Sequence, residues 1–280
     1  MKAVIKKWRL ILLSLLILAL IPAFDIRLVT RFYTVTSEKI NTGLRIALIT
    51  DLHSSGYGKN QAELIAAIDR QSPDVLLFGG DICDDIVPHD NTELLLKGVA
   101  DQYPCYYVTG NHEYWSDEVD AILGLFRAYG VTVLNDSCAL VVKNGQAINI
   151  CGIPDPDVTV YTDDVTEPSG RLEKLAQITE NGNFTLLLAH RPELIDEYAE
   201  YGFDLVLSGH AHGGQWRVPF ILNGLYAPNQ GFLPQYAGGK YTVDGSTLIV
   251  SRGLAKGSTV IPRIFNRPEL VVVDLIPASE

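Results

Sequence analysis

The sequence predicts one layered α/β domain, two packed sheets flanked by helices, behind a short N-terminal appendage. From residue 44 onward, short apolar runs alternate with amphipathic stretches, and turn residues separate them. A length of 280 residues leaves room for one large core after the appendage. We therefore divide the chain into a membrane anchor (1–28), a linker or first strand (29–43) and a main domain (44–280).

The appendage has the pattern of a membrane anchor. Lys2, Lys6, Lys7 and Arg9 precede an apolar stretch from Leu10 to Phe24. Fifteen residues of helix span only about 23 Å, so a cleaved signal peptide is an alternative by length. The small-residue pairs that cleavage requires are interrupted by Ile, which favours an uncleaved single-pass transmembrane helix. The basic flank places the N-terminus in the cytoplasm, and the main domain is expected on the extracytoplasmic side.

The main domain begins with alternating strands and helices. Apolar runs at 44–49, 75–78 and 106–108 are typical of strands, and the stretches 61–69 and 92–100 between them have helical periodicity. Later, an Asn144–Gly145 turn predicts an antiparallel hairpin. The remaining expected elements are helices at 117–129, 170–178 and after Pro192, and strands at 131–134, 139–142, 147–151, 184–189, 205–207, 248–251 and 270–275.

Charge and cysteine content exclude several classes of protein. The net charge of −11 argues against a nucleic-acid partner, because no Lys/Arg cluster follows the first ten residues. A small or membrane-borne substrate fits better. The four cysteines (Cys83, Cys105, Cys138 and Cys151) have no CxxC spacing, and we interpret them as buried thiols. The sequence leaves the oligomeric state open.

Polar side chains follow directly after five of the apolar runs. They are Asp51 and His53, Asp81, Asn111 with His112 and Glu113, His190, and His210 with His212. Ligands of α/β sheets bind beyond the carboxyl ends of the strands, so we expect these side chains to converge. Each alone would be an ordinary loop residue, but five such strand ends beside glycines predict a metal site. Imidazole and carboxylate ligands without Cys suit Mn, Fe, Zn or Co, and more than four ligands imply two divalent ions.

The motifs D-x-H, G-D, G-N-H-E, a lone H and G-H-x-H, in this order, resemble those of the calcineurin-like metallophosphoesterases. The resemblance runs from about Leu44 to Leu275 and implies that family's fold. It also implies one ion on Asp51, His53 and His212, a second on Asn111, His190 and His210, and Asp81 as the bridge. Three further segments look like the membrane-associated bacterial branch that resembles UDP-2,3-diacylglucosamine pyrophosphatases: 213–215, 252–254 and 267–269.

Such a cage predicts phosphoryl chemistry. Two divalent ions activate a bridging water and neutralise the phosphoryl oxygens during in-line attack. His112, which is beside a ligand but not counted as one, is the candidate catalytic residue that protonates the leaving oxygen. Three carboxylates are expected either to orient ligand imidazoles or to be solvated loop residues: Asp84, Asp85 and Glu113. Arg191 and Arg252 are candidates to pair with a substrate phosphate, with an ordinary surface role as the alternative.

We therefore predict a dinuclear metal-dependent enzyme that hydrolyses a phosphodiester, phosphomonoester or pyrophosphate, with a small-molecule or lipid-linked substrate at the membrane. One alternative is a UDP-2,3-diacylglucosamine-type pyrophosphatase, which would need a cytoplasmic nucleotide pool and conflicts with the expected orientation. Another is a non-catalytic metal-binding membrane scaffold or sensor. The complete ligand set argues against that alternative, because a decayed site is expected to lose costly buried ligands.

Overall fold

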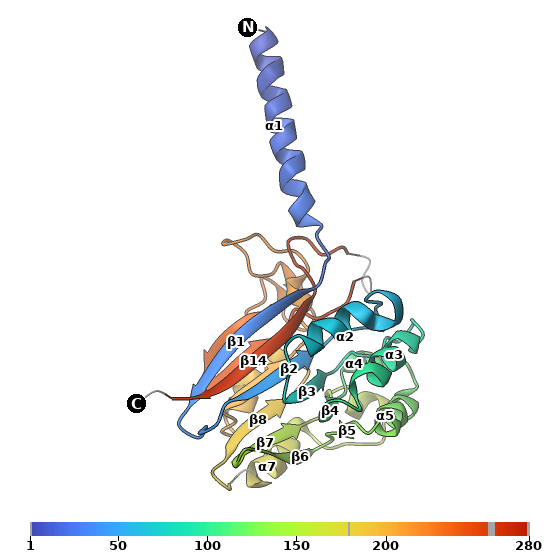
Figure 1. The fold of residues 1–280 in the computed structure, drawn as a ribbon, viewed down its shortest axis with the longest axis vertical. Coiled ribbons are helices and arrows are strands. Elements are labelled where there is room, and N and C mark those ends of the chain that lie inside the picture. Colours follow the sequence, from blue (N-terminus) through green and yellow to red (C-terminus); the bar gives the residue numbers. More distant parts are fainter. Residues whose placement is uncertain (1, 179, 257–260, 279–280) are drawn as a thin grey trace.

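The computed structural model describes residues 2–178, 180–256 and 261–278, which form a two-sheet sandwich with flanking helices and one projecting N-terminal helix (Figure 1). The α-helices are α1 (Lys2–Ala23), α2 (Ala62–Asp69), α3 (Asp90–Val99), α4 (Asn111–Trp115), α5 (Val119–Ala128), α6 (Val158–Tyr161), α7 (Pro168–Ile178) and α8 (Ile195–Ala199). The predicted layered α/β fold with two sheets is confirmed.

Each large sheet has six strands. The first has the order β1 (Val29–Ser37), β14 (Glu269–Pro277), β2 (Leu44–Ile49), β3 (Val75–Gly79), β4 (Cys105–Val108), β5 (Thr132–Val133). The second has the order β12 (Gly239–Val243), β13 (Ser246–Val250), β9 (Leu205–Ser208), β8 (Phe184–Leu188), β7 (Gln146–Gly152), β6 (Ser137–Lys143). A short pair, β10 (Tyr226–Ala227) and β11 (Gly231–Phe232), lies outside both.

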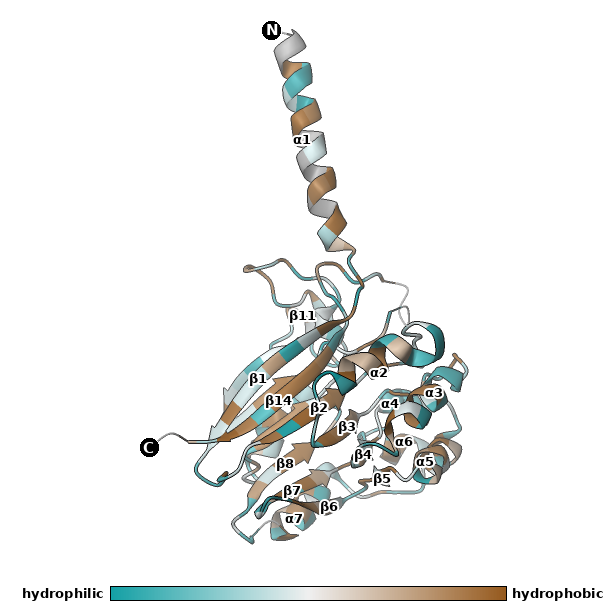
Figure 2. Cartoon of the chain, viewed as in Figure 1, coloured by the Kyte–Doolittle hydropathy of each residue, from teal (hydrophilic) through white to brown (hydrophobic). Residues whose placement is uncertain are grey.

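Burial on both faces explains why the central strands have continuous apolar runs. β3, β8 and β9 are buried along their whole length. The core between the sheets includes Ile46, Leu77 and Leu186, and separate cores lie under the helices on either outer side. Figure 2 shows the apolar character of β3 and β8. Strands β2, β3 and β4 are parallel, as are β8 and β9, so their carboxyl ends carry the loops that form the site.

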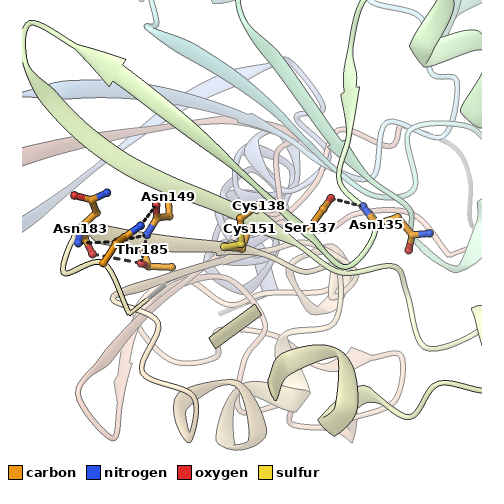
Figure 3. The surroundings of a disulfide bond; sticks show 8 residues. Asn135, Ser137, Cys138, Asn149, Cys151, Asn183 and Thr185 are labelled. Carbon is orange, nitrogen blue, oxygen red and sulfur yellow. Dashed lines mark hydrogen bonds between the residues drawn. A yellow bond between two sulfur atoms is a disulfide. The ribbon is translucent and has the colours of Figure 1, made fainter. Parts of the chain in front are cut away.

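The hairpin of β6 and β7 contains a disulfide that we did not predict. Asn144 and Gly145 form its turn with φ of 49° and 81°, as the sequence indicated. Cys138 and Cys151 lie opposite each other in the register and are disulfide-bonded (Figure 3). The interpretation of these two as thiols is wrong, because only the strand register brings them together. Cys83 and Cys105 are buried free thiols, as expected.

The N-terminal appendage forms α1, which extends away from the sandwich (Figures 1 and 2). In the part of the chain that the structure describes, no helix is both long and apolar enough to cross a membrane. The predicted transmembrane helix is therefore unsupported. The physical reason is that basic residues occupy the first turns, and the apolar part from residue 10 to 23 spans only about 21 Å of a hydrocarbon core about 30 Å thick. Residues 29–37 form β1, which pairs in parallel with β14 along its length.

Candidate metal centre

The loops after five strands bring the seven predicted metal ligands together. Asp51 and His53 follow β2, Asp81 follows β3, and Asn111 begins α4 after β4. The second sheet contributes the others from the loops after β8 and β9: His190, His210 and His212. All seven residues are buried, with no more than 6% of any of them exposed. The site therefore lies where the carboxyl ends of both sheets meet.

These side chains form two groups that share one carboxylate. In the first group, ligand atoms of Asp51, His53, Asp81 and His212 lie within 4.8 Å of one another. In the second, atoms of Asp81, His190 and His210 do the same. Asp81 belongs to both groups, which is the bridging position that the family resemblance implied. Asn111, the remaining predicted ligand, has a buried side-chain oxygen without a hydrogen-bond partner.

The donor atoms fit two divalent cations. Among the described residues, five polar atoms of this set are buried without a hydrogen-bond partner: Asp51 Oδ2, His53 Nε2, Asp81 Oδ2, Asn111 Oδ1 and His190 Nε2. Most buried polar atoms in proteins have a partner, so such a concentration requires an explanation. Imidazole nitrogen with carboxylate and amide oxygen is a ligand set suited to divalent transition metals. The family and this cluster together indicate a dinuclear metal centre.

Hydrogen bonds to the far ring nitrogens orient the ligand imidazoles. Nδ1 of His190 donates to the carbonyl oxygen of Gly79 at 2.8 Å, which leaves Nε2 as the ligand atom. Nδ1 of His53 lies 3.0 Å from the carboxylate of Asp84, the role expected for that residue. In His210 the two ring nitrogens exchange these roles. Its Nε2 lies 2.8 Å from Oδ1 of Asn229, so Nδ1 is the nitrogen left to bind a metal ion.

Glu113 holds the backbone of the site, which differs from the predicted role of orienting an imidazole. It is fully buried, and its two oxygens accept hydrogen bonds from four backbone N–H groups: Gly110 at 2.7 Å, Ile82 at 2.8 Å, Asp81 at 2.9 Å and Cys83 at 3.0 Å. These bonds join the loop after β3 to the loop after β4. Glu113 therefore fixes the position of Asp81, the carboxylate that the two groups of ligand atoms share.

The ligand loops adopt a backbone conformation that side chains disfavour. Five of the seven ligands have left-handed φ values: Asp51 at 48°, His53 at 45°, Asp81 at 53°, His210 at 63° and His212 at 46°. Non-glycine residues in this region cost on the order of 1 kcal/mol each, and such residues collect at functional sites. Gly110 and Gly209 allow the close approach, because a Cβ at either would clash with the carboxylate of Asp81 or Asp51.

The charges of the site act on one another. Burial alone would favour a neutral His190, but the carboxylate of Asp81 raises the pKa of His190 to about 10. Although burial also opposes it, His190 in turn holds the pKa of Asp81 well below its usual range. Burial and the charge of His190 lower the pKa of His210, and burial with His53 and Arg263 lowers that of His212. His210 and His212 are therefore neutral, as metal binding requires.

His112 lies at the edge of this cluster. Its backbone N–H donates to Asp81 at 2.9 Å, and its ring packs edge-on against His53 with centroids 4.3 Å apart. Nδ1 of His112 lies 2.6 Å from the carboxylate of Asp85. Asp85 therefore orients the candidate acid rather than a metal ligand. Among the described residues, none hydrogen-bonds to Nε2 of His112, so this nitrogen can transfer a proton.

Neither predicted substrate-binding arginine is free at the metal centre. Arg191 is buried and forms two hydrogen bonds with Asp155, at 2.6 and 2.8 Å, and a third with Asn229 at 2.7 Å. Arg191 is therefore not the surface guanidinium of the alternative, and its role in substrate binding stays a prediction. Arg252 faces Glu269 at 3.3 Å, in a separate pocket.

Sequence reasoning missed Asn229 and Arg263. Asn229 links His210 to Arg191, and no local motif marks it. Arg263 is buried beside Ala255, whose carbonyl oxygen accepts from its Nε at 2.9 Å, and both terminal nitrogens are buried without a partner in the described part of the chain. Its charge helps to keep His212 neutral.

Comparison with known proteins identifies the family. The family model described as calcineurin-like phosphoesterase matches residues 44–214. The chain belongs to the calcineurin-like phosphoesterases. It is 30% identical over 249 residues to an uncharacterized metallophosphoesterase of Helicobacter pylori, covering 87% of this chain and 62% of that protein. It is 30% identical over 245 residues to the uncharacterized metallophosphoesterase YkuE of Bacillus subtilis, covering 83% and 79%.

This phosphoesterase therefore spans less than two thirds of the Helicobacter relative. Among solved structures, NAD nucleotidase of Haemophilus influenzae has a TM-score of 0.56 and 16% identity, covering 77% of this chain and 46% of that one. This similarity shows the fold alone. The family model and the named relatives show that the chain contains a calcineurin-like metallophosphoesterase domain.

Proposed function

We propose that this phosphoesterase hydrolyses its substrate at two divalent ions bridged by Asp81. The observation that carries the proposal is that Asp81 belongs to both groups of ligand atoms. Asp51, His53 and His212 would hold one ion, and Asn111, His190 and His210 the other. When bound, such an ion pair activates water and neutralises phosphoryl oxygens. The protein's own contribution is to fix the ligands and to exclude bulk water from a buried cage.

His112 supplies the proton for the leaving oxygen in this proposal. Asp85 holds its Nδ1 at 2.6 Å, so the proton to be transferred resides on Nε2. Its ring lies beside His53 and is 19% exposed, so it borders the cage instead of being buried in it like the seven predicted ligands. A group at the edge can reach a leaving group without competing for a metal ion.

The substrate class we propose is a phosphodiester, phosphomonoester or pyrophosphate that is lipid-linked or part of the cell envelope, cleaved outside the cytoplasm. The Cys138–Cys151 disulfide supports this location, because structural disulfides persist mainly in oxidising compartments. The same observation disfavours the alternative of a UDP-2,3-diacylglucosamine-type pyrophosphatase, which draws on cytoplasmic nucleotide. A reporter fused after Glu280 tests the location. A cytoplasmic signal would favour the UDP-2,3-diacylglucosamine-type pyrophosphatase over the proposed envelope substrate.

The metal proposal is tested on purified full-length protein after chelation. Hydrolysis of phosphomonoesters, phosphodiesters and pyrophosphates is measured before and after adding Mn, Fe, Co or Zn. Activity should vanish on chelation and return with metal to differing degrees, because such cages discriminate poorly by affinity alone. Asp81→Asn should lose both metal and activity, since two close cations then have less charge to offset their repulsion. Full activity in metal-free protein would refute the proposal.

A further inference from the structure

A second, basic pocket lies at the end of the sandwich from which α1 projects. Its volume is about 380 Å³, and its lining includes Arg31 of β1, Arg217 and Arg252. None of the seven metal ligands lines it. Phe265, another lining residue, donates its backbone N–H to the carbonyl oxygen of Ala23 at 2.7 Å. The wall of the pocket is therefore attached to the last residue of α1.

Positive charge in this pocket exceeds negative charge. Glu269, fully buried, faces Nε of Arg252 at 3.3 Å and Nε of Arg31 at 3.8 Å. Two of the three arginines thus share one carboxylate, Arg217 forms no ion pair with a described residue, and the described lining residues include no acid. Arg31 is half exposed, but Nε of Arg252 and Nη1 of Arg217 are buried, and buried charges in proteins are normally paired, so the excess charge favours an anion. This is notable in a chain whose net charge is −11.

Arg217 has an unused donor in this pocket. Its Nη2 donates to Asn223 Oδ1, whereas its Nη1 is buried without a hydrogen-bond partner in the described part of the chain. Burial and the charge of Arg252 lower the pKa of Arg217 to about 10, which reflects the uncompensated charge. Guanidinium groups match phosphate oxygens in charge and in the spacing of their N–H donors. A phosphate oxygen would satisfy Nη1 and offset the excess charge together.

The rim of the pocket is apolar and exposed. Val218, Phe220 and Ile221 line it, and the side chains of Phe220 and Ile221 are almost entirely exposed. They belong to the loop between β9 and β10, which lies at the same end of the sandwich as α1 (Figure 1). α1 also exposes Trp8 and Leu10 among other apolar side chains. Exposed apolar side chains beside basic ones are typical of surfaces that lie on lipid.

We propose that this pocket binds the phosphate of an anionic phospholipid headgroup, with the Val218–Ile221 loop inserted among the lipid chains. The enzyme would then dock on a membrane surface at the end of the sandwich that carries α1, without requiring a helix that spans the bilayer. A soluble phosphate ester shares the headgroup's chemistry, but it gives no role to Phe220 and Ile221. The inference does not depend on hydrolysis, because the pocket shares no residue with the metal centre.

The test is sedimentation of the full-length protein with two kinds of vesicle, phosphatidylcholine alone and phosphatidylcholine mixed with anionic phosphatidylglycerol. The parent should bind the anionic vesicles more tightly. Arg31→Gln and Arg217→Gln should each weaken that binding about fivefold while leaving binding to phosphatidylcholine unchanged. Phe220→Ser with Ile221→Ser should weaken binding to both. Arg127→Gln, on the exposed side of α5 away from α1, is the matched control and should bind like the parent.

Arg31→Gln is expected to leave the fold intact, because Arg31 is half exposed and its ion pair with Glu269 is long. Weaker binding by this variant therefore cannot be attributed to misfolding. Equal binding of the parent and both arginine variants to anionic vesicles would overturn the proposal. So would a result in which Arg217→Gln loses binding of soluble glycerol phosphate but keeps its affinity for anionic vesicles, which would assign the pocket to a soluble anion. Competition by glycerol phosphate against anionic vesicles, lost in Arg217→Gln, would support the headgroup assignment.

Discussion

The side-chain oxygen of Asn229 lies 2.8 Å from Nε2 of His210 and also accepts a hydrogen bond from Arg191 at 2.7 Å. Because Arg191 is itself held by Asp155, the ring of His210 is fixed through a chain of buried groups. This chain determines which nitrogen of His210 faces the cage.

Asn229→Ala should therefore weaken binding of one ion about 10- to 100-fold while the other ion stays bound, as losses of groups that orient a metal-binding histidine do. Metal content per chain, measured during titration with a competing chelator, reports this. Asn229→Asp is the matched control, because a carboxylate still accepts from both neighbours. If each ion left Asn229→Ala at the same chelator concentration as it leaves the parent, the oxygen of Asn229 would have no role in orienting His210.

His112→Ala should separate chemistry from metal binding. Removing a group that only protonates the leaving oxygen should lower turnover of an alkyl phosphate ester about 10²–10⁴-fold. The defect should shrink for a nitrophenyl ester, since nitrophenolate leaves readily without a proton. Metal content should stay near that of the parent. Asp85→Asn should give a smaller defect of the same kind, because it disturbs only the orientation of the ring. Loss of metal in His112→Ala would show that His112 is a ligand.

Much of this site follows from the chain itself, for a simple physical reason. Buried parallel strands require continuous apolar runs, so the residue after each run marks a carboxyl end, and Asp51, Asp81 and His190 are visible there. The sequence does not show which strands or side chains pair with each other when they are far apart along the chain. β1 pairs with β14 some 240 positions later, and Cys138 meets Cys151 only through the hairpin register. For the same reason the sequence does not show that Asp155 and Arg191, 36 positions apart, form a buried ion pair.

Metal uptake should depend on pH through His190. Asp81 raises the pKa of its imidazole to about 10 against burial, so without metal the ring is protonated at neutral pH. A metal ion must displace that proton, and metal affinity should therefore rise with pH and proton release should accompany binding. A dye in weakly buffered solution measures the release. His190→Gln should release fewer protons, and equal release by parent and variant would contradict the assignment.

The same group should make metal-free protein less stable in alkali. The pKa of His190 is near 6.5 in the unfolded chain and about 10 in the folded protein, so protonation of this ring stabilises the folded state. The stabilisation is complete below pH 6.5 and is lost as the pH rises through about 10. Urea denaturation of chelated protein at several pH values should show a falling free energy of unfolding across this window. The fall should be smaller in His190→Gln, which removes this group's contribution and leaves the others.

Glu113→Gln should destabilise the protein even without metal. The carboxylate accepts hydrogen bonds from four backbone N–H groups, two on each oxygen. An amide keeps one oxygen, so its NH₂ group faces two N–H donors that lose their acceptor inside the protein. Each unsatisfied donor costs about 1–3 kcal/mol, which predicts a loss of about 2–6 kcal/mol in the free energy of unfolding.

Urea denaturation in the presence of chelator measures this loss apart from any effect on metal binding. Glu118→Gln, an exposed carboxylate ahead of α5, is the matched control and should change stability by less than about 0.5 kcal/mol. Metal content of Glu113→Gln should also fall, because Asp81 and Gly110 lose the group that holds their loops together. A variant as stable as the parent, with both ions bound, would mean that the two loops are held by their own packing and that Glu113 is dispensable.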